Sequence, residues 1–127
     1  MTELRRLSVD DIDEIKSLFR DIFTFEPWND DWSDDGQLEG YIIDIIGNRN
    51  SLALGLYENG VLTGISLGNV MHWYMGTNYY IIELGIKPEC QGRGLGTEFL
   101  RMIEEYIHAN GISCIFLQTE RDMPAYD

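Results

Sequence analysis

The fold is decided by the stretch Ile86-Lys87-Pro88-Glu89-Cys90-Gln91-Gly92-Arg93-Gly94-Leu95-Gly96-Thr97, in which a strand ends, a glycine-rich loop turns and a helix begins. Glycine lets a backbone approach a ligand closely and adopt turns that other residues avoid. The N-terminus of the helix that follows presents unpaired N–H groups and the positive end of the helix dipole. We therefore expect this segment to hold an anion such as a pyrophosphate.

Two familiar phosphate-binding motifs do not match this loop. A P-loop ends in Gly-Lys-Ser/Thr, whereas Gly96 is followed by Thr97 and no lysine. A dinucleotide-binding fingerprint has the spacing G-x-G-x-x-G, and counted from Gly92 and Gly94 its last position is Thr97. That fingerprint also belongs in the first strand-to-helix turn of a domain, and at least three strands are expected before this one. The match that remains is Q-x-x-G-x-G, which begins at Gln91.

The segments around the loop alternate between strand and helix patterns. In order, they are a strand over 3–7, a helix over 9–24, a helix from about 33 to 46, strands over 51–58, 61–70 and 79–87, the helix after the loop, and a strand over 112–119. Asn59-Gly60 is a strong hairpin signal, and an irregular stretch is expected at 76–78. The order β-α-α-β-β-β-α-β predicts an α/β (α+β) fold, with a mixed central β-sheet flanked by helices in one domain over 1–127.

Composition excludes several classes of protein. The chain has 127 residues and a net charge of −13, so it lacks the clustered cations that nucleic acids or an anionic membrane surface would require. The charge favours cationic partners. No apolar run approaches the length of a membrane span, and there is no signal-peptide pattern, which predicts a cytoplasmic protein. Cys90 and Cys114 have no CxxC spacing, so neither a disulfide framework nor a metal site is expected.

The Q-x-x-G-x-G loop, placed after a strand that ends Ile-Lys-Pro, resembles the acetyl-CoA loop of the GNAT superfamily of N-acetyltransferases. The order of elements is similar to that of the family over nearly the whole chain. The resemblance implies direct transfer of an acetyl group from acetyl-CoA to an amine, with the donor lying where the parallel strands 79–87 and 112–119 separate. It implies that the donor is bound by backbone groups of two sets of residues: Leu84, Gly85 and Ile86 for the pantetheine arm, and Gln91, Gly92, Arg93, Gly94, Leu95, Gly96 and Thr97 for the pyrophosphate.

Strand 79–87 contains a candidate catalytic base and a glycine whose place in a strand needs an explanation. An amine attacks a thioester only when it is neutral, so its proton needs an acceptor. Glu83 is the candidate base, because a carboxylate in an apolar strand is costly unless it faces a cleft or a partner. The resemblance supports this role, since the strand carries an acidic base in many GNAT enzymes. Gly85 indicates either a bulge or close approach of a ligand, or simply relief of packing.

The acceptor site is expected to involve the connection between the first two helices. In the family this connection borders the acceptor, and here it is rich in carboxylates, which bind ammonium groups, and in tryptophan, which stacks on sugars or cations. The candidate substrate-binding residues are Glu26, Trp28, Asp30, Asp31 and Trp32 of this connection and His72 near the end of strand 61–70. An equally weighted interpretation is structural: the carboxylates of the connection form a solvated helix cap, and its tryptophans are anchored in the core. The pattern also resembles aminoglycoside acetyltransferase-like members, which favours a small amine such as an aminoglycoside or polyamine.

The end of the sequence departs from the family pattern. Members typically continue from this point as A-x-x-F-Y-x-x-x-G-F through a helix and one or two strands, and that Tyr commonly protonates the departing thiolate. Ala125 matches the start of the motif, but Tyr126 does not replace its Tyr. A domain without this segment would expose strand 112–119 as a sheet edge, which predicts pairing with a second copy as a homodimer. Two alternative functions therefore stay open: acetylation of a protein N-terminus or lysine, and acyl-CoA binding with weak catalysis.

Overall fold

The computed structural model describes residues 1–25 and 28–117 and contains five strands and three α-helices in those ranges. The strands are β1 (Thr2–Leu7), β2 (Ser51–Glu58), β3 (Val61–Trp73), β4 (Gly76–Ile86) and β5 (Cys114–Leu117), and the α-helices are α1 (Ile12–Phe23), α2 (Asp35–Ile46) and α3 (Leu95–Ala109). Short 3₁₀ helices, η1 (Val9–Asp11) and η2 (Pro88–Cys90), precede α1 and follow β4. The predicted order of elements and the mixed α/β architecture are confirmed.

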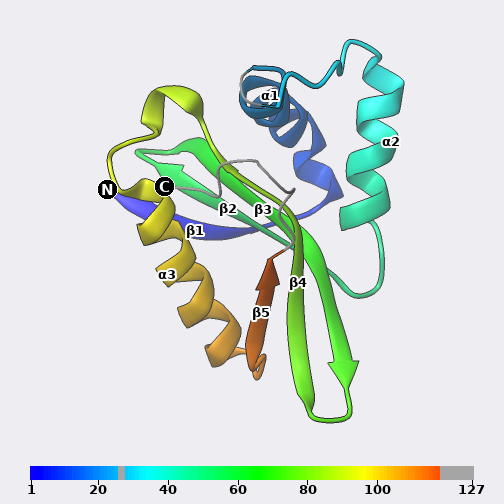
Figure 1. Ribbon diagram of the computed structural model, residues 1–127, viewed down its shortest axis with the longest axis vertical. Coiled ribbons are helices and arrows are strands. Elements are labelled where there is room, and N and C mark those ends of the chain that lie inside the picture. The colour runs from blue at the N-terminus through cyan, green and yellow to red at the C-terminus, as the bar shows by residue number, and fades with distance from the viewer. Residues whose placement is uncertain (26–27, 118–127) are drawn as a thin grey trace.

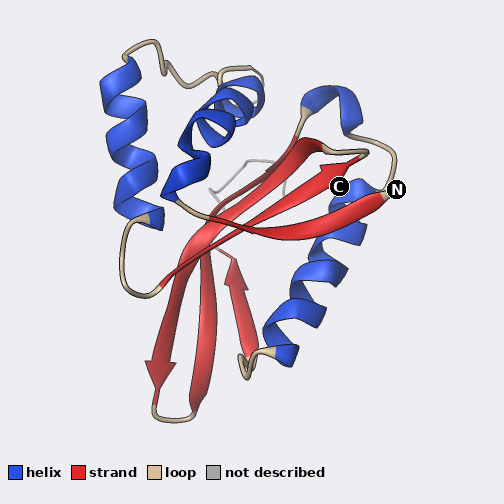
Figure 2. Ribbon diagram, turned by 180° about the vertical axis from the view of Figure 1, so that it is seen from behind, coloured by secondary structure: helices blue, strands red, loops and turns tan. Residues whose placement is uncertain are grey.

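The five strands form one sheet in the order β1-β2-β3-β4-β5 (Figure 1). The first three pairs are antiparallel and β4–β5 is parallel. Figures 1 and 2 show α1 and α2 beside one face of the sheet and α3 on the other. Each face therefore has its own apolar core, and the β4 side chains are divided between the two.

Local signals in the sequence account for the helix ends. Ser8 and Asp11 form a capping box at the start of η1. Asp34 caps α2 by accepting a hydrogen bond from the backbone N–H of Gln37, and Gly47 follows the last turn of α2. Because the cap is Asp34, α2 begins slightly later than the expected start near residue 33.

The β3–β4 hairpin is longer than the sequence indicated. The stretch 76–78 was expected to be irregular, and that prediction is wrong: β3 runs on to Trp73, and pairing continues to Trp73 opposite Gly76. The backbone hydrogen bonds of the hairpin override the weak strand preference of Thr77-Asn78. The hairpin therefore forms an arm that extends away from the helices α1 and α2 (Figure 1).

A β-bulge interrupts the middle of β4. Leu67 of β3 pairs with Glu83, whereas the next residue, Gly68, pairs with Ile81, so Ile82 is an additional residue in β4. A bulge bends its strand and changes the direction of the side chains beside it. A bulge was one of the interpretations of Gly85, but the bulge lies three residues earlier.

Two glycines are explained by close packing in this part of the sheet. A Cβ atom on Gly85 would lie 2.9 Å from Cγ2 of Ile22 and 3.4 Å from the ring of Phe23, both in α1. A Cβ atom on Gly68 would lie 2.0 Å from the carbonyl oxygen of Tyr80, where β4 bulges against β3. Relief of packing is therefore sufficient to account for Gly85.

The parallel pairing of β4 and β5 covers only part of β4. The paired residues run from Asn78 opposite Cys114 to Ile81 opposite Leu117. The segment of β4 from Ile82 to Ile86 extends past the last described residue of β5. Residues 118 and 119, which were expected to complete the last strand, lie outside the described residues.

Candidate active site

The glycine loop adopts the geometry expected of an anion-binding turn. Gly92 and Gly94 have φ values of +80° and +76°, in the left-handed region that favours glycine. Gly94 is the N-cap of α3 and supplies no side-chain cap, so no side chain of the loop satisfies the first N–H groups of this 15-residue helix. A Cβ on either glycine would meet nothing within 4 Å. The loop is therefore open toward solvent, and its glycines are required by backbone conformation.

The side chains of the loop fix its position relative to the sheet. Gln91 donates a hydrogen bond from Nε2 to the carbonyl oxygen of Ile86, 3.0 Å away. Arg93 pairs with Glu58 at the end of β2, with 2.8 Å between guanidinium nitrogen and carboxylate oxygen. That carboxylate raises the pKa of Arg93. The cation is thus neutralised within the protein, whereas the first backbone N–H groups of α3 have no side-chain cap.

Leu84, Gly85 and Ile86 connect the loop to the bulge. All three residues lie at the C-terminal end of β4 and are buried. Leu84 and Ile86 belong to the core beneath α3, whereas Gly85 faces α1. A ligand at this position would therefore contact only their backbone.

Glu83 lies between the bulge and these residues and faces the other helical layer. Its Oε2 accepts a hydrogen bond of 2.5 Å from the hydroxyl of Tyr41 in α2. Burial is the main cause of the raised pKa of Tyr41, followed by the hydrogen bond to Glu83 and the negative charge of Asp30. The tyrosine therefore stays protonated and serves as a donor at every physiological pH. Tyr41 was not among the candidate residues selected from the sequence, in which it is a single phenol within the largely aliphatic stretch 38–46.

Trp32 completes this cluster. Its ring stacks on the ring of Tyr41, with centroids 5.3 Å apart, and meets Phe19 edge-on at 5.6 Å. The indole Nε1 of Trp32 is buried and has no hydrogen-bond partner in the described part of the chain. The structure thus brings together Glu83, Tyr41, Trp32 and Asp30 from β4, α2 and the connection before α2.

The other residues of the connection divide between structural and exposed roles. Trp28 packs edge-on against Phe23, with ring centroids 5.1 Å apart, and joins the core. Asp31 caps the backbone N–H of Ser33 over 3.1 Å, and hydrogen bonds from Ser33 lower the pKa of Asp31. Asp35 pairs with Lys16 and Arg20 of α1. Glu26 lies outside the described residues.

His72 is not brought to this cluster. It pairs with Thr77 near the tip of the hairpin arm, six positions before Glu83 along β4, which corresponds to about 20 Å. Figure 1 shows the arm and the α1–α2 connection at opposite ends of the molecule. Two further residues with reactive side chains have structural settings: Cys90 is buried, and the ring of His108 contacts the carbonyl oxygen of Ser113 at 3.3 Å.

No group of three or more potential metal ligands occurs within residues 1–25 and 28–117. In the same ranges, no helix has the length and apolarity required to cross a bilayer.

Comparison with known proteins places this arrangement in a family. Residues 12–126 match the model of the Acetyltransferase (GNAT) family. An aminoglycoside acetyltransferase from an uncultured soil metagenomic sample, in complex with sisomicin, has a similar structure, with a TM-score of 0.71 and 19% identity over 94% of this chain and 78% of that one. The ribosomal-protein-alanine N-acetyltransferase of Brucella melitensis biovar Abortus 2308 has a TM-score of 0.72 and 14% identity over 96% and 82% of the two chains.

A third similar structure contains a donor analogue. AAC(6')-Iy in complex with the bisubstrate analogue CoA-S-monomethyl-acetylneamine has a TM-score of 0.67 and 14% identity, over 96% of this chain and 82% of that one. At these identities the structures show a shared fold. The family match covers most of the chain, so the protein belongs to the GNAT family of acetyltransferases, which use acetyl-CoA. The resemblance noted in the sequence and the expectation of an enzyme are confirmed.

Proposed function

We propose that this protein transfers the acetyl group of acetyl-CoA to a primary amine of a small, cationic acceptor. The observation that carries the proposal is the position of Glu83. It lies at the bulge of β4 with its carboxylate bonded to Tyr41, and the same strand leads within a few residues into the open glycine loop. A proton acceptor and a binding element for a pyrophosphate are thus consecutive features of one segment.

The donor site is formed by backbone groups. The left-handed turns at Gly92 and Gly94 leave the N-terminus of α3 open, and N–H groups at a helix N-terminus bind phosphate oxygens well. Arg93 is held by Glu58, so binding through the backbone fits the loop better than binding through a cationic side chain. Gln91, Leu95, Gly96 and Thr97 complete the segment.

Acetyl-CoA supplies the acetyl group as a thioester; the C–N bond forms as the C–S bond breaks, and the thiol is released. The chain's own contribution is to accept the proton that the attacking nitrogen loses. The carboxylate of Glu83, which accepts a hydrogen bond from Tyr41, would accept this proton directly or through water. The hydroxyl also limits rotation of the carboxylate and so fixes the direction from which a proton is accepted.

The acceptor would lie on the α1–α2 side, next to Glu83. Asp30 is close enough to influence Tyr41 electrostatically, and Trp32 provides an aromatic face and an N–H that has no partner among residues 1–25 and 28–117. A carboxylate and an aromatic ring are suited to an ammonium group or a sugar. Trp28 and Asp31 support the connection, and Glu26 belongs to the same proposed lining. An aminoglycoside or polyamine fits this description, and 1–127 would act as one acetyltransferase domain.

The experiment is a calorimetric titration with acetyl-CoA, followed by thiol release measured across a panel of amines. We expect saturable donor binding, weakened by Gly94→Ala because alanine is strained at a positive φ, and turnover with aminoglycosides or polyamines. Absence of donor binding would overturn the proposal. Turnover only with peptides would identify a protein acetyltransferase, and binding without turnover would identify an acyl-CoA-binding domain.

A further inference from the structure

Most lysine and arginine side chains of this acidic protein are paired with carboxylates. Within residues 1–25 and 28–117, every lysine and arginine except Arg6 and Arg49 forms an ion pair with an aspartate or glutamate. Arg6 donates a hydrogen bond to the carbonyl oxygen of Ser51 at 3.3 Å, and Arg49 has no hydrogen-bond partner in these ranges. In a chain of net charge −13, two unneutralised guanidinium groups are an unusual feature.

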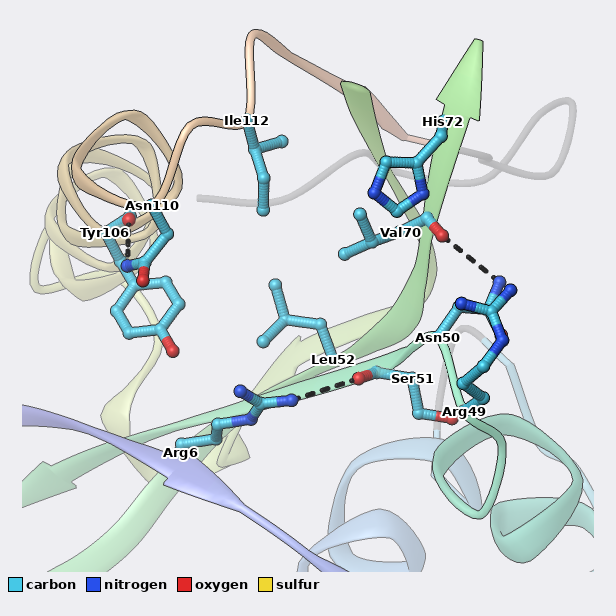
Figure 3. Close-up of a pocket in the computed structure, with 10 residues that line it drawn as sticks. All are labelled: Arg6, Arg49, Asn50, Ser51, Leu52, Val70, His72, Tyr106, Asn110 and Ile112. Carbon is cyan, nitrogen blue, oxygen red and sulfur yellow. Dashed lines mark hydrogen bonds between the residues drawn. The ribbon is translucent and has the colours of Figure 1, made fainter. Parts of the chain in front are cut away.

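Both of these arginines line the same cavity, of about 180 Å³ (Figure 3). Asn50, His72, Tyr106 and Asn110 contribute further polar groups, and Leu52, Val70 and Ile112 form an apolar surface between them. No carboxylate is among the residues that line the cavity. An adjacent hollow of about 280 Å³ shares Arg6, Arg49 and Ser51 and likewise has no carboxylate in its lining.

The polar groups of the cavity are held in place by backbone contacts. Asn50 donates from Nδ2 to the carbonyl oxygen of Val70 over 3.1 Å, and Asn110 donates from Nδ2 to that of Tyr106 over 2.8 Å. The hydrogen bond from Arg6 to Ser51 uses one nitrogen of the guanidinium and leaves its other N–H groups available. The cavity therefore presents the positive charge of Arg6 and Arg49 with no carboxylate among its lining residues to neutralise it.

This cavity is separate from the proposed acetyl-transfer site. Tyr106 and Asn110 lie at the C-terminal end of α3, about 20 Å along the helix from the glycine loop at its N-terminus. The cavity also lies on the α3 side of the sheet, whereas Glu83 bonds to α2 on the opposite side.

We propose that this cavity is a second binding site, specific for a small organic anion whose carboxylate or phosphate group is held by Arg6 and Arg49. Guanidinium groups bind both of these oxyanions through paired N–H donors. The apolar surface of Leu52, Val70 and Ile112 would contact the hydrocarbon part of the ligand. The small volume excludes a nucleotide-sized molecule and suits a single ring or a short chain.

The test is a titration of the whole chain with benzoate and phenyl phosphate, followed by NMR of the methyl groups of Leu52, Val70 and Ile112. Benzyl alcohol is the neutral control, and inorganic phosphate controls for an adventitious ion. We expect saturable binding of at least one organic anion, and no binding of benzyl alcohol. Inorganic phosphate should bind more weakly than phenyl phosphate, because it cannot use the apolar surface.

Three variants assign the binding to the cavity. Arg6→Gln and Arg49→Gln should each weaken the affinity about tenfold, as expected for loss of a charge-assisted hydrogen bond. Arg5→Gln is the matched control, because Arg5 neighbours Arg6 in β1 and is already paired with Glu3. Arg49 makes no described hydrogen bond, so its replacement should leave folding intact. Failure of both organic anions to bind, or equal weakening by Arg5→Gln, would overturn the proposal.

Discussion

Tyr41 of α2 donates a hydrogen bond of 2.5 Å to Glu83 of β4, across the interface between the helical layer and the sheet. This contact joins the proposed base to the element that borders the proposed acceptor site. The phenol fixes one carboxylate oxygen and stays protonated, because burial and the negative charge of Glu83 raise its pKa. Substitution of Glu83 and substitution of Tyr41 should therefore affect turnover and stability differently.

Replacement of the proposed base should affect turnover and not donor binding. In Glu83→Gln the amide cannot accept the amine proton, so we expect kcat to fall about 100-fold or more. Affinity for acetyl-CoA, measured by calorimetry, should be unchanged, because the glycine loop is intact. A wild-type rate of thiol release in this variant would remove Glu83 from the proposed role.

Tyr41→Phe should lower both stability and turnover, each moderately. Loss of the hydrogen bond to a carboxylate should reduce the free energy of unfolding by about 1 kcal/mol, and kcat should fall because the carboxylate is no longer held in one orientation. Tyr57→Phe is the control, since the hydroxyl of Tyr57 bonds to Glu14 at 3.2 Å. That variant should lose stability and keep its kcat. Equal effects of the two variants on kcat would contradict a positioning role for Tyr41.

Two glycine-to-alanine variants should change stability in opposite directions. In Gly85→Ala the new Cβ would lie 2.9 Å from Ile22, so we expect a loss of about 1–3 kcal/mol from overpacking. In Gly40→Ala the new Cβ has nothing within 4 Å inside helix α2, and we expect a gain of about 0.5–1 kcal/mol. Urea unfolding measures both. A neutral Gly85→Ala would show that α1 does not pack as closely on β4 as described.

Acid should weaken the contact between α1 and α2. Hydrogen bonds from Lys16 and Arg20 lower the pKa of Asp35 from its ordinary value of 3.8. The lowered pKa means that the ion pair stabilises the folded state fully above about pH 4, and that this contribution is lost as the pH falls further. In Asp35→Asn this part of the acid dependence should disappear. Thermal unfolding between pH 2.5 and 6 tests it, and identical profiles for both proteins would contradict the assignment.

Much of the fold could be predicted from the sequence because its signals are local. The hairpin at Asn59-Gly60, the caps at Ser8 and Gly47, and the glycine loop each depend on a few adjacent residues, and the order of elements followed from them. The extension of the β3–β4 hairpin was not predicted, because it depends on hydrogen-bond partners in the neighbouring strand. The residues 77 and 78 carry no strong strand preference of their own.

The candidate site was predictable only in part. Glu83 and the loop stand out because a carboxylate and glycines are unusual in their contexts. Tyr41 could not be assigned, since its contact depends on how α2 packs against β4. The acidic composition of the connection pointed to a cation-binding region as a whole. Composition does not reveal that Asp35 forms an ion pair with a residue of the neighbouring helix. The cavity that contains Arg6 and Arg49 unites residues from elements far apart in the sequence.

The additional residue Ile82 has a consequence for the design of variants. Tyr79 and Ile81 before it, and Leu84 and Ile86 after it, all enter the core beneath α3, so the alternation of β4 would become regular if Ile82 were absent. Deletion of this one residue would leave every core side chain on its present face and every other strand pair in register. The protein could therefore lose the kink beside Glu83 and keep its architecture, which makes the geometry of the proposed site separable from the stability of the sheet that supports it.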